Sequence, residues 1–119
     1  MDYLLVNKNK KSYLCLVTKK FIMKTKTEYL ELLRLYKQQM AERYGIIRLG
    51  IFGSVSRNEQ KEDSDLDVCV EMKEPDGFIL LNIKYELEEL LKCKIDIVRL
   101  RDNMNALLKR NIDRDGIYV

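Results

Sequence analysis

The sequence contains no histidine, and its three cysteines, Cys15, Cys69 and Cys93, are an odd number without CxxC spacing. Histidines and closely spaced cysteines are the usual zinc ligands of proteins, so a zinc site is excluded. A disulfide framework is excluded with it, because the cysteines cannot all pair. The lack of histidine also removes the most common general base. We therefore expect reduced thiols and a site whose chemistry depends on other side chains.

Long apolar runs are also missing. No stretch approaches the roughly 20 apolar residues that a membrane-spanning helix needs, and the N-terminus does not resemble a secretory signal peptide. With reduced thiols, these absences predict a cytoplasmic protein that does not bind a membrane. Of the 119 residues, 46% are hydrophobic. We expect one small domain with a modest core and no second domain.

The charge is nearly balanced, with a formal net charge of +3 at pH 7. Much of the excess lies near the N-terminus, in Lys8, Lys10, Lys11, Lys19, Lys20, Lys24 and Lys26. We interpret this cluster as a solvated start of the chain, so nucleic acid is not an expected partner. Residues 1–22 are expected to be an extension of a domain at 23–119. They form either an extra hairpin from the β-prone runs at 4–6 and 13–17 or the product of an upstream start codon.

The remaining residues alternate between the period of a helix and that of a strand. Thr25 and Glu28 have the spacing of a capping box, and the pattern that follows predicts a helix that ends at Gly45. The apolar side of this helix is expected to contain Leu30, Leu33, Tyr36 or Lys37, Met40 and Tyr44. A buried strand at 46–52 and a short helix within 55–60 are expected next.

A second strand is predicted at 65–71, and Pro75-Asp76-Gly77 marks a break after it. An amphipathic helix, a strand through Asp96 and a last helix follow, before a turn at Asp115-Gly116 leads to a short tail at 117–119. The apolar sides of the two helices are expected to contain Leu80, Ile83, Leu87, Leu90 and Leu91 in the first and Leu107, Leu108 and Ile112 in the second. This order favours an α+β (α/β) fold with a small mixed β-sheet and packed helices.

The most informative pattern is the pair Gly53-Ser54, followed after ten residues by Asp65-Leu66-Asp67. Alternate residues of a strand share a face, so Asp65 and Asp67 are expected to point the same way. Two carboxylates at that spacing repel each other unless a cation lies between them. Hard oxygen ligands favour Mg²⁺ or Mn²⁺, which commonly bind one or two carboxylates together with substrate phosphates.

The glycine-serine pair is suited to the phosphates. Gly53 has no Cβ to obstruct the approach of a phosphate to the backbone, and Ser54 adds a hydroxyl. If a helix follows, the N–H groups of its first turn and its dipole face the same anion. Taken singly, each residue fits an ordinary turn or a solvated strand carboxylate. The combination and its spacing predict a metal and nucleotide site.

The string GSVSRNEQKEDSDLD, with the later KCKIDIV, resembles the minimal nucleotidyltransferase (MNT) family, small stand-alone members of the polymerase-beta-like nucleotidyltransferase fold. The resemblance extends from about residue 23 to residue 119. It implies that Asp65 and Asp67 bind metal and that Asp96, on a neighbouring strand, is the third carboxylate. The alternation of Asp96 with two isoleucines independently turns it away from them.

The resemblance further implies transfer of a nucleoside monophosphate from ATP to a hydroxyl, with pyrophosphate as the leaving group. Two Mg²⁺ or Mn²⁺ ions, roughly 3.5 to 4 Å apart in such sites, would be held by the three carboxylates and would lower the pKa of the acceptor hydroxyl. The third carboxylate could also accept the proton. Gly53 and Ser54 would cradle the β and γ phosphates. Arg57 would screen phosphate charge, or form a salt bridge with Glu59 or Asp63.

One position departs from the Arg-Gly-Glu that is usual in the family, since this chain has Arg57-Asn58-Glu59. Asparagine tolerates a left-handed backbone better than most residues do, so we expect the loop to keep its shape. The carboxylates and the glycine-serine pair are intact, and an inactive relic is not expected.

Members of the family include MntA-like antitoxins, the partners of HEPN-domain toxins. The resemblance therefore implies an antitoxin that transfers AMP from ATP to a hydroxyl, expected to be a tyrosine, on a HEPN ribonuclease toxin encoded next door. Bulk and negative charge near a ribonuclease site oppose the binding of RNA phosphates. Two alternatives stay open: a non-catalytic antitoxin that acts by contact, and a nucleotidyltransferase for a small molecule or an RNA end. The small size of the chain disfavours the last.

Overall fold

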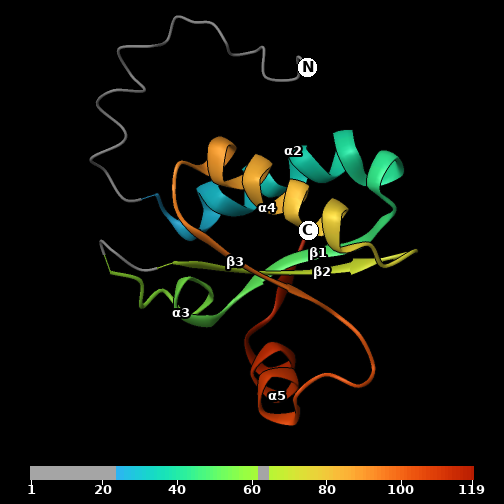
Figure 1. Cartoon of the computed structure of the whole chain (residues 1–119). Coiled ribbons are helices and arrows are strands. Elements are labelled where there is room, and N and C mark those ends of the chain that lie inside the picture. Colours follow the sequence, from blue (N-terminus) through green and yellow to red (C-terminus); the bar gives the residue numbers. More distant parts are fainter. Residues whose placement is uncertain (1–23, 62–64) are drawn as a thin grey trace, which may run out of the picture.

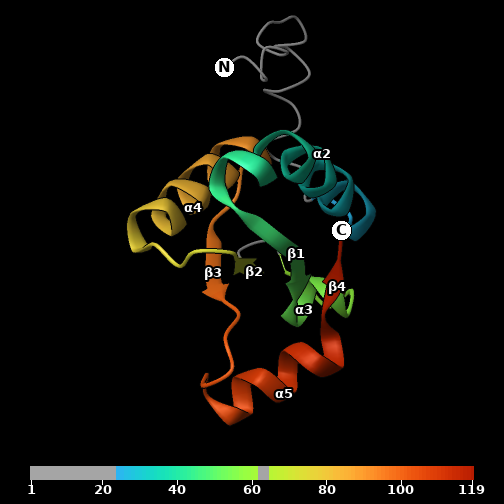
Figure 2. The same ribbon diagram turned by 90° about the vertical axis from the view of Figure 1, so that its right-hand side faces the viewer.

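Helices cover both faces of a four-stranded sheet in the computed structural model of the chain (Figures 1 and 2). The structure describes residues 24–61 and 65–119, and the hairpin predicted within 1–22 lies outside the described residues. The strands are β1 (Ile46–Phe52), β2 (Leu66–Met72), β3 (Ile95–Arg99) and β4 (Ile117–Tyr118). Their order is β3-β2-β1-β4; β1 is antiparallel to β2 and β4, and β2 is parallel to β3. The predicted mixed sheet is confirmed.

Helix α2 (Lys26–Tyr44) begins and ends where the sequence predicts. The Thr25 hydroxyl accepts the Glu28 N–H at 3.2 Å, and the Glu28 carboxylate accepts the Thr25 N–H at 2.9 Å, which completes the capping box. Gly45 ends the helix in the left-handed conformation, at φ 69°.

The buried side of α2 is rotated slightly from the predicted one. Its buried residues are Tyr29, Leu33, Tyr36 and Met40. Leu30 and Tyr44 are only partly buried. On this side α2 also contacts α4 (Gly77–Leu91), where the Tyr36 and Tyr44 hydroxyls donate to the two oxygens of Glu86 at 2.7 and 2.8 Å.

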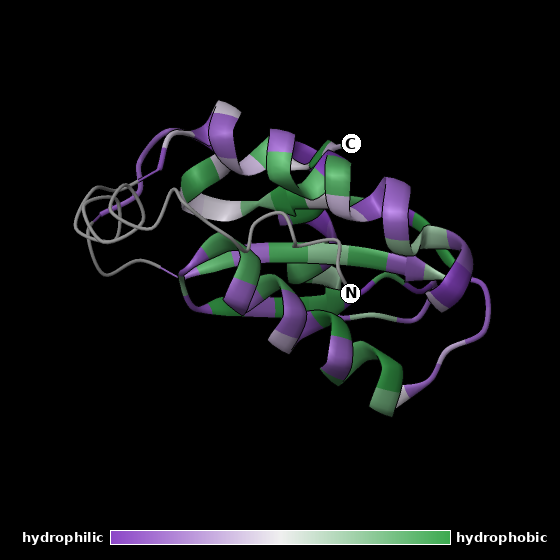
Figure 3. Cartoon of the chain, turned by 90° about the horizontal axis from the view of Figure 1, so that it is seen from above, coloured by the Kyte–Doolittle hydropathy of each residue, from purple (hydrophilic) through white to green (hydrophobic). Residues whose placement is uncertain are grey.

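Helix α4 follows the predicted break. The Asp76 carboxylate accepts the backbone N–H groups of Phe78 and Ile79 at 2.9 and 3.2 Å, and so caps the N-terminus of the helix. Its buried residues, Ile83, Leu87 and Leu91, belong to the predicted apolar side. Seen from above, hydrophobic residues dominate the strands, while α2 and α4 carry polar and apolar stripes (Figure 3).

The alternation of β2 divides the molecule into two cores. Leu66, Val68 and Val70 point toward α2 and α4 and lie in the main core. The residues between them point to the opposite face, which we call the α5 face because α5 (Ala106–Asp115) lies on that side (Figure 2). A second core there consists of Phe52, Cys69, Met104 and Ile112.

Three expectations need correction. Strand β2 begins at Leu66, so Asp65 precedes the strand rather than opening it. Leu107 does not belong to a core; it is 60% exposed, because α5 meets the sheet along a narrow side that contains Leu108 and Ile112. The predicted tail at 117–119 contains β4, which pairs with β1.

None of the helices within the described ranges combines the length and the apolar character that crossing a membrane requires.

Candidate functional site

Two of the predicted carboxylates are direct neighbours on parallel strands. Asp67 of β2 is in register with Asp96 of β3, and on its other side it is paired with Phe52, the last residue of β1. Asp67 and Asp96 both lie on the α5 face, because the residues that alternate with them are in the main core. Asp65 lies immediately before β2, at the same end of the sheet. The structure therefore brings the three predicted carboxylates to one end of one face.

The electrostatic properties of Asp67 reflect this grouping. Its pKa is raised to about 6, first because it is partly buried and then because Asp96 and Asp65 repel its negative charge. The guanidinium of Arg57 acts in the opposite direction. A carboxylate that is desolvated and repelled by two others is stabilised by a cation, so the donor set fits a hard divalent ion.

The carboxylates do not form a complete ligand set alone. Within residues 24–61 and 65–119, no three acidic, cysteine or histidine side chains converge into a metal site. An ion here would take its remaining ligands from substrate phosphates and water, as Mg²⁺ commonly does when protein supplies one or two carboxylates.

Gly53 makes room for Asp67. Its φ is 78°, a left-handed conformation that favours glycine, and a Cβ on it would lie 2.1 Å from Oδ2 of Asp67. The sequence explained this glycine by the approach of a phosphate. The structure adds a second reason, because any side chain at this position collides with the carboxylate.

The turn that follows β1 differs from the expected helix within 55–60. Helix α3 (Gly53–Ser56) begins earlier and has only four residues. Its dipole is therefore small, and any anion binding must depend on individual N–H groups and the Ser54 hydroxyl. Asn58 closes the turn at φ 60°, and the N–H of Glu59 donates to the Ser54 carbonyl at 2.8 Å. The expectation that Asn58 accommodates a left-handed backbone is confirmed.

Arg57 is held by two carboxylates. Its Nε donates to Glu59 at 2.9 Å, as one interpretation of the sequence predicted, and its Nη1 donates to Asp115 at 2.7 Å. Asp63, the other predicted partner, lies outside the described residues. The role of Arg57 toward phosphate stays a prediction.

Asp115 was missed by the sequence analysis, which assigned it only to a turn. Its side chain is 5% exposed and also accepts two hydrogen bonds from Arg114, both at 2.9 Å. Arg114 and then Arg57 lower the pKa of Asp115 to about 2. The Ser56 hydroxyl donates to the Asp115 backbone carbonyl. No local signal predicts this contact, because 58 residues separate Arg57 from Asp115.

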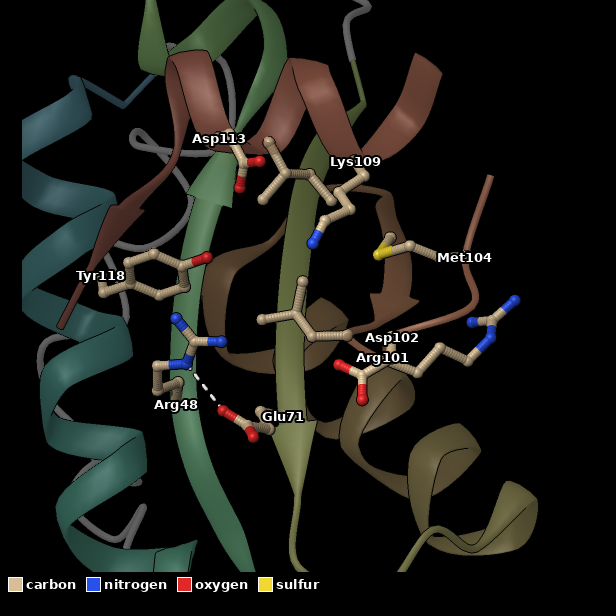
Figure 4. A pocket seen from close by; sticks show the side chains of 10 residues that line it. Arg48, Glu71, Arg101, Asp102, Met104, Lys109, Asp113 and Tyr118 are labelled. Carbon is tan, nitrogen blue, oxygen red and sulfur yellow. Dashed lines mark hydrogen bonds and ion pairs between the residues drawn. The ribbon is translucent and has the colours of Figure 1, made fainter. Parts of the chain in front are cut away.

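A polar hollow of about 120 Å³ lies elsewhere on the same side of the sheet (Figure 4). Arg48 and Glu71 of neighbouring strands, joined by an ion pair of 2.7 Å, form part of its wall, with Tyr118 and Lys109 nearby. These strand positions lie at the opposite end of the β1–β2 ladder from Phe52 and Asp67. The hollow is thus separate from the carboxylates and the turn.

Most of the chain matches one known protein family. Residues 33–119 match the family described as "Nucleotidyltransferase domain". The matched range contains the Gly53 turn and all three carboxylates.

Similar proteins include two that are matched over nearly their whole length. A candidate protein adenylyltransferase of Methanocaldococcus jannaschii is 37% identical over 98 residues, which cover 82% of this chain and 100% of that protein. The protein adenylyltransferase MntA of Thermococcus cleftensis is 33% identical over 98 residues, which cover 82% of this chain and 98% of that protein.

Solved structures with the same fold include a candidate minimal nucleotidyltransferase. It is 36% identical, with a TM-score of 0.60, over 74% of this chain and 93% of that chain. A toxin–antitoxin crystal structure with AMP-PNP is 21% identical, with a TM-score of 0.58, over 68% and 67% of the two chains. A structure of a tri-AMPylated HEPN toxin of Shewanella oneidensis in complex with MNT antitoxin is 19% identical, with a TM-score of 0.50, over 71% of this chain and 69% of that chain. For the last two, the likeness concerns the fold alone.

Proposed function

Because the chain belongs to the nucleotidyltransferase domain family, we propose that it is a protein adenylyltransferase that acts as an antitoxin. It transfers AMP from ATP to a hydroxyl of a partner protein, and pyrophosphate leaves. The observation that carries the proposal is the pairing of Asp67 with Asp96 beside the Gly53 turn. The similarity to proteins named as protein adenylyltransferases supports a protein as the acceptor.

Each residue of the site has a role in this reaction. Asp65, Asp67 and Asp96 would hold Mg²⁺ or Mn²⁺, which supplies charge neutralisation and lowers the pKa of the acceptor hydroxyl. Asp96, which is exposed and lies beside Asp67, would accept the proton of that hydroxyl. The turn that begins at Gly53 and Ser54 receives the β and γ phosphates. A bond forms between the acceptor oxygen and the α phosphorus as the bond from that phosphorus to the bridging oxygen breaks.

The proposed partner is a HEPN-domain toxin encoded beside this chain, and the proposed acceptor is one of its tyrosines. Two structures of the same fold support this choice. One is a toxin–antitoxin complex with AMP-PNP, and the other is a tri-AMPylated HEPN toxin in complex with MNT antitoxin. The first also supports ATP as the nucleotide. Added AMP brings negative charge to a ribonuclease, and that charge opposes the binding of RNA phosphates.

The test is the intact mass of a HEPN-type partner after incubation with this chain, ATP and Mg²⁺. We expect a gain of one or more AMP units with the wild type and none with the Asp65→Asn/Asp67→Asn double variant. Glu71→Gln is the matched control, because Glu71 shares the strand and face of Asp67 but lies at the opposite end of the ladder. It should retain full transfer.

The remaining outcomes separate the alternatives. A stable complex without any gain in mass would sink the enzymatic proposal and leave neutralisation by contact. Radiolabel from α-labelled ATP in RNA or a small molecule, with none in the partner, would reassign the acceptor.

A further inference from the structure

We propose that Asp115 is a positioning residue for the nucleotide, because it fixes Arg57 and the Gly53–Ser56 turn in the arrangement that receives the triphosphate. This inference rests on the proposed function, since it assigns a part in nucleotide binding to a residue at the end of α5. Asp115 itself does not touch the nucleotide and acts through Arg57.

The contacts join α5 to the end of α3 and to Arg57, the residue that follows it. The Asp115 carboxylate accepts Nη1 of Arg57 at 2.7 Å, and the Asp115 backbone carbonyl accepts the Ser56 hydroxyl. Ser56 is 8% exposed and is the last residue of α3, so the anchor lies at the end of the phosphate turn. Lys26 adds a third contact from α2, because its Nζ donates to the Ser56 carbonyl at 3.2 Å. The turn is therefore fixed from two sides.

Helix stability does not explain a carboxylate at this position. Asp115 is the last residue of α5, where the negative end of the helix dipole disfavours an anion. Arg114 compensates locally through two hydrogen bonds. The additional bond to Arg57 therefore serves a distant element, and what it determines is the orientation of the guanidinium.

Arg57 keeps the capacity to bind phosphate. Its side chain is 38% exposed. Within the described part of the chain, its hydrogen bonds use Nε and Nη1, so Nη2 has no partner there. Its backbone N–H donates to the Gly53 and Ser54 carbonyls at 3.2 and 3.1 Å, so the residue is attached directly to the turn. A planar guanidinium fixed at one side presents its remaining N–H groups in a defined direction, as phosphate recognition requires.

The experiment measures the Kd of a fluorescent ATP analogue with Mg²⁺, together with KM for ATP and kcat in the transfer assay. We expect Asp115→Asn to weaken binding and raise KM about tenfold, the size of one lost charge-assisted contact, with a smaller change in kcat. The matched control is Arg114→Gln, which disturbs the same carboxylate but leaves its bond to Arg57. It should change Kd less than about threefold, although both variants lower Tm.

A double-mutant cycle shows whether Asp115 acts through Arg57. In an Arg57→Gln background, Asp115→Asn should add less than about twofold to Kd, because the group that it positions is already gone. If Asp115→Asn does not fold, Ser56→Ala carries the test through the second anchor, with an expected rise in Kd of about threefold.

The outcomes distinguish this inference from the proposed function. Wild-type nucleotide binding that Asp115→Asn and Ser56→Ala leave unchanged would overturn the inference alone. Full additivity in the cycle would also overturn it, since it would show a general effect on stability. A wild-type chain that binds no nucleotide would overturn both.

Discussion

At the scale of single residues, Asp67 is the carboxylate whose negative charge is most strongly disfavoured by burial and by its acidic neighbours. A partly buried carboxylate between Asp65 and Asp96 is less stable ionised than it would be in water, and its pKa is raised to about 6 accordingly. The folded chain thus binds a proton at Asp67 more tightly than the unfolded chain does. The same site is expected to exchange that proton for a divalent cation.

Asp67→Asn should therefore stabilise the apo protein while it abolishes transfer. The folded pKa lies above the unfolded value of 3.8, so stability falls as pH rises from about 4 to about 6, and the full penalty is present at pH 7. After a discount for partial exposure, we expect a gain of about 1 to 2 kcal/mol in the free energy of unfolding at pH 7. Urea denaturation at pH 7 and at pH 3.5 checks this prediction. A gain of equal size at both pH values would contradict it.

Gly53→Ala should destabilise the fold and remove activity. The Cβ would lie 2.1 Å from Oδ2 of Asp67, and φ 78° is unfavourable for alanine, so we expect a loss of more than about 1 kcal/mol. Gly77→Ala is the control, because a Cβ there has nothing within 4 Å. Urea denaturation of the two variants side by side measures the difference. Equal stability of both would show that the turn relaxes without cost.

At the scale of elements, the sequence was informative where an element depends on its own residues. The boundaries of α2 follow from a capping box and a terminal glycine, and those of β1 from one apolar run. It was uninformative where an element depends on a distant one. Strand β4 forms because Gly50 of β1 has no side chain; a Cβ there would lie 2.4 Å from the Ile117 carbonyl. Neither residue alone predicts a strand of two residues.

The residues of the candidate site also fall into those that the local sequence predicts and those that it does not. The residues within one motif, Gly53, Asp65 and Asp67, were predicted from spacing, and Asp96 from its alternation and the family resemblance. Asp115 was not, because its ion pair with Arg57 exists only when α5 has packed on the sheet. Contacts of this kind require the fold to be known first.

The end of α5 should lose stability in acid. Arg114 and Arg57 lower the folded pKa of Asp115 to about 2, below the unfolded value of 3.8. The stabilisation is therefore fully present above about pH 4 and is lost as pH falls toward 2. We expect the difference in Tm between the wild type and Asp115→Asn to be constant from pH 7 to pH 5 and to shrink below pH 4. Differential scanning calorimetry checks it, and a difference independent of pH would contradict it.

At the scale of the whole molecule, the main core and the predicted site lie on opposite faces of the sheet. Helices α2 and α4 bury the main core on one face, and the carboxylates lie on the α5 face (Figure 2). Substitutions on the two faces should therefore act differently, on stability in the main core and on ligand binding at the carboxylates.

Mg²⁺ with ATP should raise Tm, and chelation of the metal should reverse the gain. A ligand that binds only the folded state at about 100 times its Kd adds about 2.7 kcal/mol to the free energy of unfolding. The Asp65→Asn/Asp67→Asn variant should show no gain, because it lacks the carboxylates that would hold the ion. Thermal scans with Mg²⁺, ATP, both and EDTA measure it. An equal gain for the double variant would place the nucleotide elsewhere.

The long separation between Arg57 and Asp115 also bears on the order of folding. The ladder of β1 with β2 and the pairing of Asp67 with Asp96 close shorter loops than the 58 residues between the members of this ion pair. Shorter loops close at lower entropic cost, so we expect the carboxylates to be paired in the folding transition state and α5 to dock later. Folding and unfolding kinetics of two variants measure this order. The φ-value of Val68→Ala should be about 0.5 or higher, and that of Ser56→Ala should lie near zero. Transient detachment of α5 would then leave a chain that keeps its carboxylates aligned but loses the ordered turn and the packing of Ile112 in the second core.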